Sequence, residues 1–163
     1  MSDGGESYRA NLEMLGRSED DNALAGFIQD LGESPRVFSG SQVALYHFPL
    51  TSFSFSCNGR TLRAANFYFD TDQKRSRSFS EAIVQGVVSS DSREDVRRKI
   101  AIAPFRSVEV GGDYWDSYEL ESRFVVSFVF KVASGRLQCA TVQRLEEPTQ
   151  SDQKLHIVPT KWD

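Results

Sequence analysis

Two stretches of this sequence place an apolar residue, most often phenylalanine, at every second position. In the first, residues 52–57, Phe53, Phe55 and Cys57 fall on one side of an extended chain. The second stretch puts a longer series on one side, namely Phe124, Val126, Phe128, Phe130 and Val132. A period of two is the pattern of a strand with one buried face, and aromatic residues favour strands. The chain must therefore contain a sheet with an aromatic core on one side.

Glycine turns follow both stretches and indicate hairpins. Asn58-Gly59 is a strong signal for a tight hairpin, and Ser134-Gly135 occupies the corresponding place after the second stretch. Pro49 ends a further strand-like run, residues 43–48. The expected strands are 43–48, 52–57, 62–69, 114–120, 124–132 and 137–145.

A helical pattern precedes each group of strands. Leu24, Phe27, Ile28 and Leu31 recur at the spacing of one helix face, and the helix is expected to end before Pro35. The second helix is expected to begin after Asp91 or Ser92, with Asp95 completing a variant capping box, and to end at Pro104. Val96, Ile100 and Ala103 form its thin apolar stripe.

The order of helix, proline, strands, glycine turn and strand thus occurs twice. We expect one domain over residues 1–163, with internal repeats at approximately 18–70 and 88–145 and a polar tail at 146–163. The predicted fold class is α+β: two helix-plus-antiparallel-strand repeats that form one antiparallel sheet with helices on one face.

Charge and composition exclude several classes of function. The net charge is −4 and the isoelectric point about 5.3, whereas nucleic-acid binders usually carry a basic excess. Acidic residues outnumber basic ones before Pro35, so we expect a protein partner with a basic surface, although a solubilising face explains the same charges. No apolar run is long enough for a membrane span and the N-terminus lacks the pattern of a signal peptide, which predicts no membrane partner and a cytoplasmic location.

The residues that usually perform catalysis do not form a known motif. Cys57 and Cys139 lie in separate strands without an identifiable base, and we expect both to be free thiols. His47 and His156 are isolated, and neither metal-ligand spacing nor a phosphate loop is present. We therefore expect no enzyme activity, no cofactor and no metal site.

The residues most suggestive of binding lie in the segment 113–119. If it is a strand, Trp115 shares its more polar face with Ser117 and Glu119. Tryptophan among acids on an open sheet face is typical of an interface anchor, whereas packing beneath a loop or a helix end is the alternative. The candidate partner-binding residues are Trp115, Asp116, Glu119, Tyr46 and Asp113.

The segment 88–143 resembles the repeat found in SmpA/OmlA-type lipoproteins and in the beta-lactamase inhibitory protein. The resemblance is carried by Asp91-Ser92-Arg93, Val96, Pro104, Trp115, Tyr118, Phe128, Phe130 and Gly135, with a looser match in the first half. It implies two units side by side in one antiparallel sheet, with a protein held on the sheet face that the helices leave open. The lipobox cysteine of the lipoproteins and the disulfides of the inhibitor have no counterpart in this chain.

These observations favour a non-catalytic protein-binding protein. By analogy with the inhibitor, the leading expectation is a bacterial immunity protein that binds and neutralises a cognate secreted toxin. The alternative is a secretion or assembly chaperone, which would be a stable dimer that holds an extended segment. A third alternative is a small-ligand-binding protein or an enzyme with a site inside a curved sheet.

Overall fold

The structure is a computed structural model that describes residues 12–69, 79 and 82–145, so the expected tail at 146–163 lies outside the described residues. Its named helices are α2 (Asn22–Leu31), the 3-10 helix η1 (Val84–Gly86) and α3 (Arg93–Ile100), and residues 12–14 are also helical. No described helix combines the length and the apolar character that crossing a bilayer requires.

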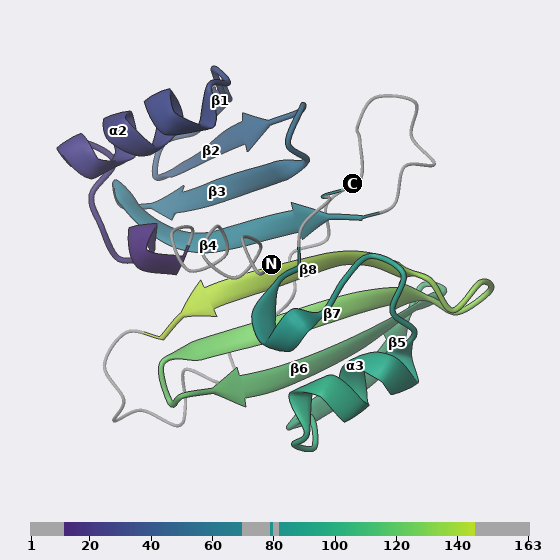
Figure 1. The fold of residues 1–163 in the computed structure, drawn as a ribbon. Coiled ribbons are helices and arrows are strands. Elements are labelled where there is room, and N and C mark those ends of the chain that lie inside the picture. Colours follow the sequence, from purple (N-terminus) through teal and green to yellow (C-terminus); the bar gives the residue numbers. More distant parts are fainter. Residues whose placement is uncertain (1–11, 70–78, 80–81, 146–163) are drawn as a thin grey trace.

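All eight named strands belong to one antiparallel sheet with the order β1-β2-β3-β4-β8-β7-β6-β5. The strands are β1 (Arg36–Ser39), β2 (Val43–Phe48), β3 (Phe53–Asn58), β4 (Thr61–Tyr68), β5 (Arg106–Val110), β6 (Asp113–Leu120), β7 (Phe124–Lys131) and β8 (Leu137–Arg144). Each half of the chain runs from a helix into four consecutive strands, and β4 of the first half pairs with β8 of the second (Figure 1). The edges of the sheet are therefore β1 and β5, the first strand of each half.

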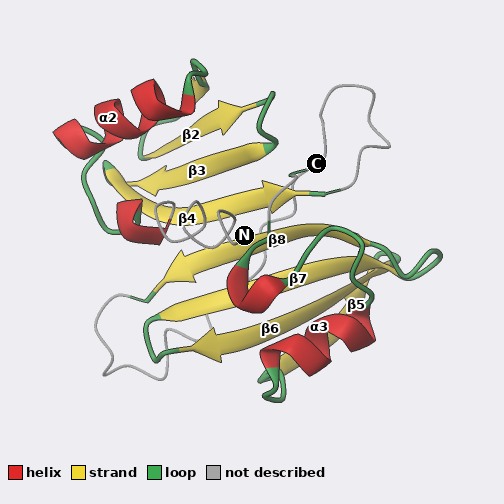
Figure 2. Ribbon diagram, viewed as in Figure 1, coloured by secondary structure: helices red, strands yellow, loops and turns green. Residues whose placement is uncertain are grey.

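The predicted α+β class is wrong. The described chain is mostly sheet, its helices are short, and the molecule is closer to an all-β protein (Figure 2). Two strands that the sequence did not predict, β1 and β5, account for the difference. Both are edge strands paired on one side only, and the exposed pattern of β1 gives little alternation to detect.

Capping residues set the ends of the two longer helices. The side chain of Asp21 accepts the backbone N–H of Ala23 at the start of α2, and Gly32, with φ of 71°, ends the helix in the left-handed conformation. At α3, Ser92 and Asp95 form the expected capping box. These caps satisfy backbone groups that each helix end would otherwise leave unpaired.

The core lies on the sheet face that carries the helices, as the alternating aromatic residues predicted. Phe53, Phe55, Phe128 and Phe130 are all buried, at no more than 1% exposure. Phe27 of α2 contacts the rings of Phe48, Phe53 and Phe55. From α3, Val96 and Ile100 complete the same buried cluster. We call this side the helix face and the other side the opposite face.

Candidate functional site

Strand β6 presents different residues to the two faces of the sheet. Its register aligns Trp115 with Val129, Ser117 with Ser127 and Glu119 with Val125. Because successive side chains alternate, these residues lie on the opposite face, while Tyr114, Asp116 and Tyr118 lie on the helix face. The expectation that Trp115 shares a face with Ser117 and Glu119 is confirmed.

Trp115 stands between two valines on the opposite face. Val108 of β5 is its direct neighbour on one side and Val129 of β7 on the other. Trp115 and Val108 are partly exposed, whereas Val129 is buried, at 3% exposure. Asp113 and Glu119 lie on the same face at the two ends of β6. The result is an apolar stripe of three residues with a carboxylate at each end of the central strand.

Asp116 lies on the helix face, where its carboxylate is bound within the protein. Its side chain is 1% exposed and accepts two hydrogen bonds from Arg93, each of 2.8 Å, and one from Ser107 Oγ of 2.6 Å. Although burial alone would raise the pKa of Asp116, the hydrogen bonds from Arg93 and Ser107 hold it below its usual value. Asp116 therefore anchors α3 to the sheet and does not share a surface with Trp115.

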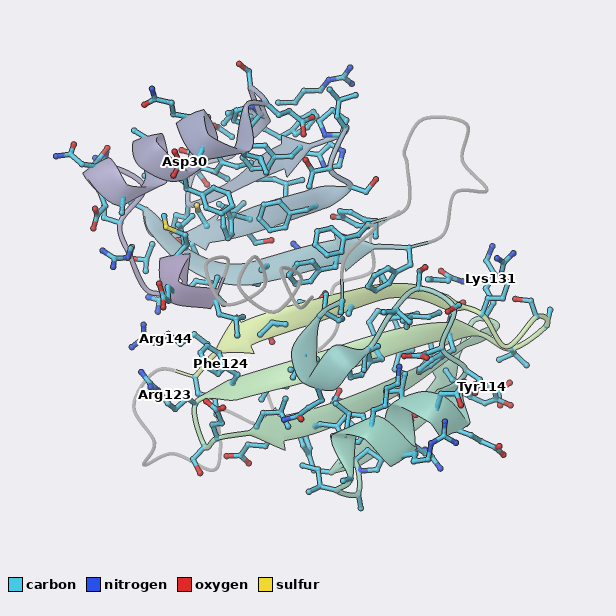
Figure 3. All side chains as sticks on the ribbon, viewed as in Figure 1. Asp30, Tyr114, Arg123, Phe124, Lys131 and Arg144 are labelled. Atoms are coloured by element: carbon cyan, nitrogen blue, oxygen red, sulfur yellow. The ribbon has the colours of Figure 1, made fainter. Side chains whose placement is uncertain are left out.

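Tyr114 completes this anchor. Figure 3 shows Tyr114 beside α3, and the guanidinium of Arg93 lies 4.2 Å from the centre of the Tyr114 ring. A cation over an aromatic face is attracted by the ring quadrupole. A second arginine, Arg97, approaches Asp116 at 3.5 Å and keeps 45% of its side chain exposed. The helix thus has one firmly held arginine and one more loosely held arginine.

Tyr46, the candidate on β2, also lies on the helix face. Its hydroxyl donates a hydrogen bond of 2.9 Å to Glu19. Burial and then this hydrogen bond raise the pKa of Tyr46 to about 12. Tyr46 therefore lies at the other end of the sheet from Trp115 and on the other side of it. Of the five sequence candidates, Trp115, Glu119 and Asp113 lie on the opposite face, all in β6, and Asp116 and Tyr46 lie on the helix face.

A polar row that the sequence did not predict crosses the opposite face. The strand register aligns His47, Ser54, Asn66, Thr141, Ser127, Ser117 and Arg106 across seven strands. Asn66 donates to Ser54 Oγ and accepts from Thr141 Oγ1, both at 3.0 Å, and the hydroxyls of Ser117 and Ser127 lie 2.8 Å apart. The sequence signal for this row was the serines that alternate with aromatic residues, as in residues 52–57.

His47 and Ser54 are cross-strand partners, but they do not present a nucleophile to solvent. Ser54 is fully buried, and its hydroxyl is hydrogen-bonded with Tyr68 and Asn66. Burial and then the charge of Arg36 lower the pKa of His47. The described part of the chain also contains no cluster of acidic, histidine or cysteine side chains suited to a metal ion.

Both cysteines are free in the structure. Cys57 is buried on the helix face, and Cys139 lies on the opposite face beside Val129. Burial raises the pKa of each thiol to about 12. Thiols with such a pKa carry little thiolate near neutral pH and are weak nucleophiles.

Comparison with known proteins indicates the fold alone. No family model matches this chain, and no curated protein is similar to it. A crystal structure of an extracellular protein containing a SCP domain, from Bacillus anthracis str. Ames, matches 85% of this chain with a TM-score of 0.50 and 14% identity. The match spans 46% of the length of that protein.

Proposed function

We propose that this chain is a bacterial immunity protein: a non-catalytic protein that binds and neutralises a secreted toxin with the opposite face around Trp115. The observation that carries the proposal is the position of Trp115. It lies between Val108 and Val129 on the face over which no described helix packs (Figure 1). Tryptophan offers a large contact area at low entropic cost and is enriched among residues that dominate binding energy.

The net charge of the chain, −4, supports a basic partner. On the face of Trp115 itself the charges are mixed: Asp113 and Glu119 border the apolar stripe, Lys131 is the cross-strand neighbour of Asp113, and Arg106 is paired with Ser117. The net charge attracts a cationic protein over distances of about a Debye length, roughly 10 Å at 0.1 M salt. The neutralising role itself is taken from the resemblance to the inhibitory repeat.

The test is capture of the partner from the native host, followed by titration with two variants. Trp115→Ala should weaken binding at least about thirtyfold, because it removes a central anchor. Phe38→Ala is the matched control, since Phe38 is an aromatic residue on the same face, 58% exposed, at the far edge of the sheet. The captured protein should be a toxin whose activity disappears when this chain is added.

Equal binding by wild type and Trp115→Ala, with both proteins folded, would place the site elsewhere. Capture of a partner that stays active in the complex would instead support the chaperone alternative. A small molecule that raises the melting temperature, with no protein captured, would favour a ligand-binding protein.

A further inference from the structure

The exposed large hydrophobic side chains gather at the two ends of the sheet. Among the described residues they are Val37, Phe38, Val43, Leu50, Ile102, Phe105 and Val110. The first four belong to β1, β2 and the turn after β2, and the last three lie in β5 or in the loop before it. Exposed apolar groups beside an unpaired strand edge are typical of a surface that pairs with another strand.

The free edge of β5 carries backbone groups in a self-complementary arrangement. Strands β5 and β6 are joined by the two-residue turn Gly111–Gly112, which makes Val110 and Asp113 a hydrogen-bonded pair. Because such pairs alternate along an antiparallel ladder, the N–H and C=O groups of Ser107 and Glu109 turn to the free edge. A second β5, related by a twofold axis at Val108, would place Glu109 opposite Ser107 of the second copy, in register for two pairs of hydrogen bonds.

The side chains of this arrangement also match. On the helix face, Ser107 lies beside Arg97, whose Nη2 is 3.5 Å from Ser107 Oγ. The exposed carboxylate of Glu109 would therefore meet the loosely held Arg97 of the second copy, and symmetry produces this contact twice. On the opposite face, Val108 would touch Val108 of the second copy and extend the apolar stripe that contains Trp115. Val110, 44% exposed, would lie beside Arg106 of the second copy.

The free edge of β1 lacks the charge complementarity found at β5. A twofold pairing of β1 at Phe38 would place Val37 opposite Ser39 of a second copy and bring no opposite charges together. Strand β1 is also one residue shorter than β5. The charge complementarity between Glu109 and Arg97 therefore selects β5 and selects a second copy of this chain as its occupant.

We propose that the protein forms a homodimer in which the β5 strands of two copies pair antiparallel about a twofold axis at Val108. The axis is perpendicular to the sheet, so both copies turn their opposite faces to the same side. The two Trp115 residues then lie three strand spacings apart, about 14 Å, on one continuous sheet. The dimer presents two copies of the apolar stripe side by side, which goes beyond the function proposed above.

The test measures the mass of the full chain by sedimentation velocity over a range of concentrations. Wild type should be a dimer. Glu109→Pro, which removes an N–H that points to the free edge, should make it a monomer, while Val37→Pro, a proline placed in the other edge strand, β1, should leave it a dimer. Glu109→Lys should weaken dimerisation at least tenfold, because it opposes Arg97 with a like charge. Circular dichroism shows whether each variant is folded.

A cross-linking experiment covers the case in which Glu109→Pro does not fold. Val108→Cys should form an intermolecular disulfide on mild oxidation, because paired residues at the axis have Cα atoms about 4.5–5.5 Å apart. Phe38→Cys and wild type, which retains the native thiols, are the controls. A wild-type monomer at about 1 mM, where micromolar dimers associate, would overturn the proposal. So would loss of the dimer in Val37→Pro or preferential cross-linking of Phe38→Cys.

Discussion

Trp115 and Asp116 are adjacent in strand β6, yet their side chains lie on opposite faces of the sheet. The Trp115 ring stands between Val108 and Val129, whereas the Asp116 carboxylate is held by Arg93 beneath α3. Neighbouring residues therefore serve different purposes: Asp116 fixes a helix to the sheet, and Trp115 contributes to a surface. Substitutions at the two positions should separate stability from binding.

Replacing Asp116 with alanine should destabilise the protein by about 3 kcal/mol, because it leaves Arg93 without its partner at a partly buried site. Denaturant unfolding measures the change. Asp20→Ala is the matched control: it also removes a carboxylate paired with an arginine, Arg60, but both side chains are largely exposed. Its free energy of unfolding should stay near that of wild type. Equal losses in the two variants would contradict the role of Asp116 as an anchor.

The same ion pair predicts how stability depends on pH. The pKa of Asp116 is lower in the folded protein than its ordinary value of 3.8, so the unfolded chain binds a proton more readily at this residue. The stabilisation is complete above pH 3.8 and is lost as the pH falls through the folded pKa. Between pH 6 and pH 2, the free energy of unfolding should therefore decrease less steeply for Asp116→Asn than for wild type. Parallel curves would show that other carboxylates dominate acid unfolding.

The alternation in the sequence predicted the central strands because each of them buries one apolar face, which is aromatic in most of them. Strand β2 was predicted with its observed bounds, and the other five central strands to within a residue or two at either end. Strands β1 and β5 escaped because edge strands have only one partner and bury little, as the exposed residues of β1 show. Without β1 and β5, the predicted fold contained too little sheet relative to helix, and this led to the α+β class.

The site was predicted in part for a related reason. The period of two placed Trp115 correctly with Ser117 and Glu119, but it also puts Asp116 with Tyr114 and Tyr118 on the core side. A carboxylate at a core position needs a partner, and Arg93 and Arg97, spaced four apart on a predicted helix, were the available cations. The pairing across 23 residues depends on how α3 packs, which the sequence does not reveal.

The aromatic core makes a direct prediction about stability. Phe128 is fully buried and contacts the rings of Tyr118 and Phe130, so Phe128→Ala should cost about 3–5 kcal/mol. Phe38→Ala removes the same atoms from a side chain that is 58% exposed and should cost far less. Thermal and denaturant unfolding of both variants provide the comparison. A small loss for Phe128→Ala would mean that the core is not packed around this ring.

Thiol chemistry tests the two cysteines. Because burial raises the pKa of Cys57 and Cys139 to about 12 from the ordinary 9.0, the thiolate fraction near pH 8 should be lower by about a thousandfold. The folded protein should therefore react slowly with a thiol reagent, and both thiols should react at once in guanidinium without reductant. Failure of the denatured protein to react would reveal a disulfide and contradict the free thiols of the structure.

The role of charge in partner binding leads to a prediction about rates. Glu119 lies on the face of Trp115, and electrostatic attraction acts mainly on association. Glu119→Lys should therefore slow association with the basic partner several-fold at low salt and change dissociation little. The difference should shrink as salt rises, since screening shortens the range of the attraction.

Asp30→Lys is the matched control, because it changes the net charge equally from an exposed position on α2, labelled in Figure 3. Equal effects of the two substitutions would show that net charge alone steers the partner, and a change confined to Asp30→Lys would move the binding surface to the helix face.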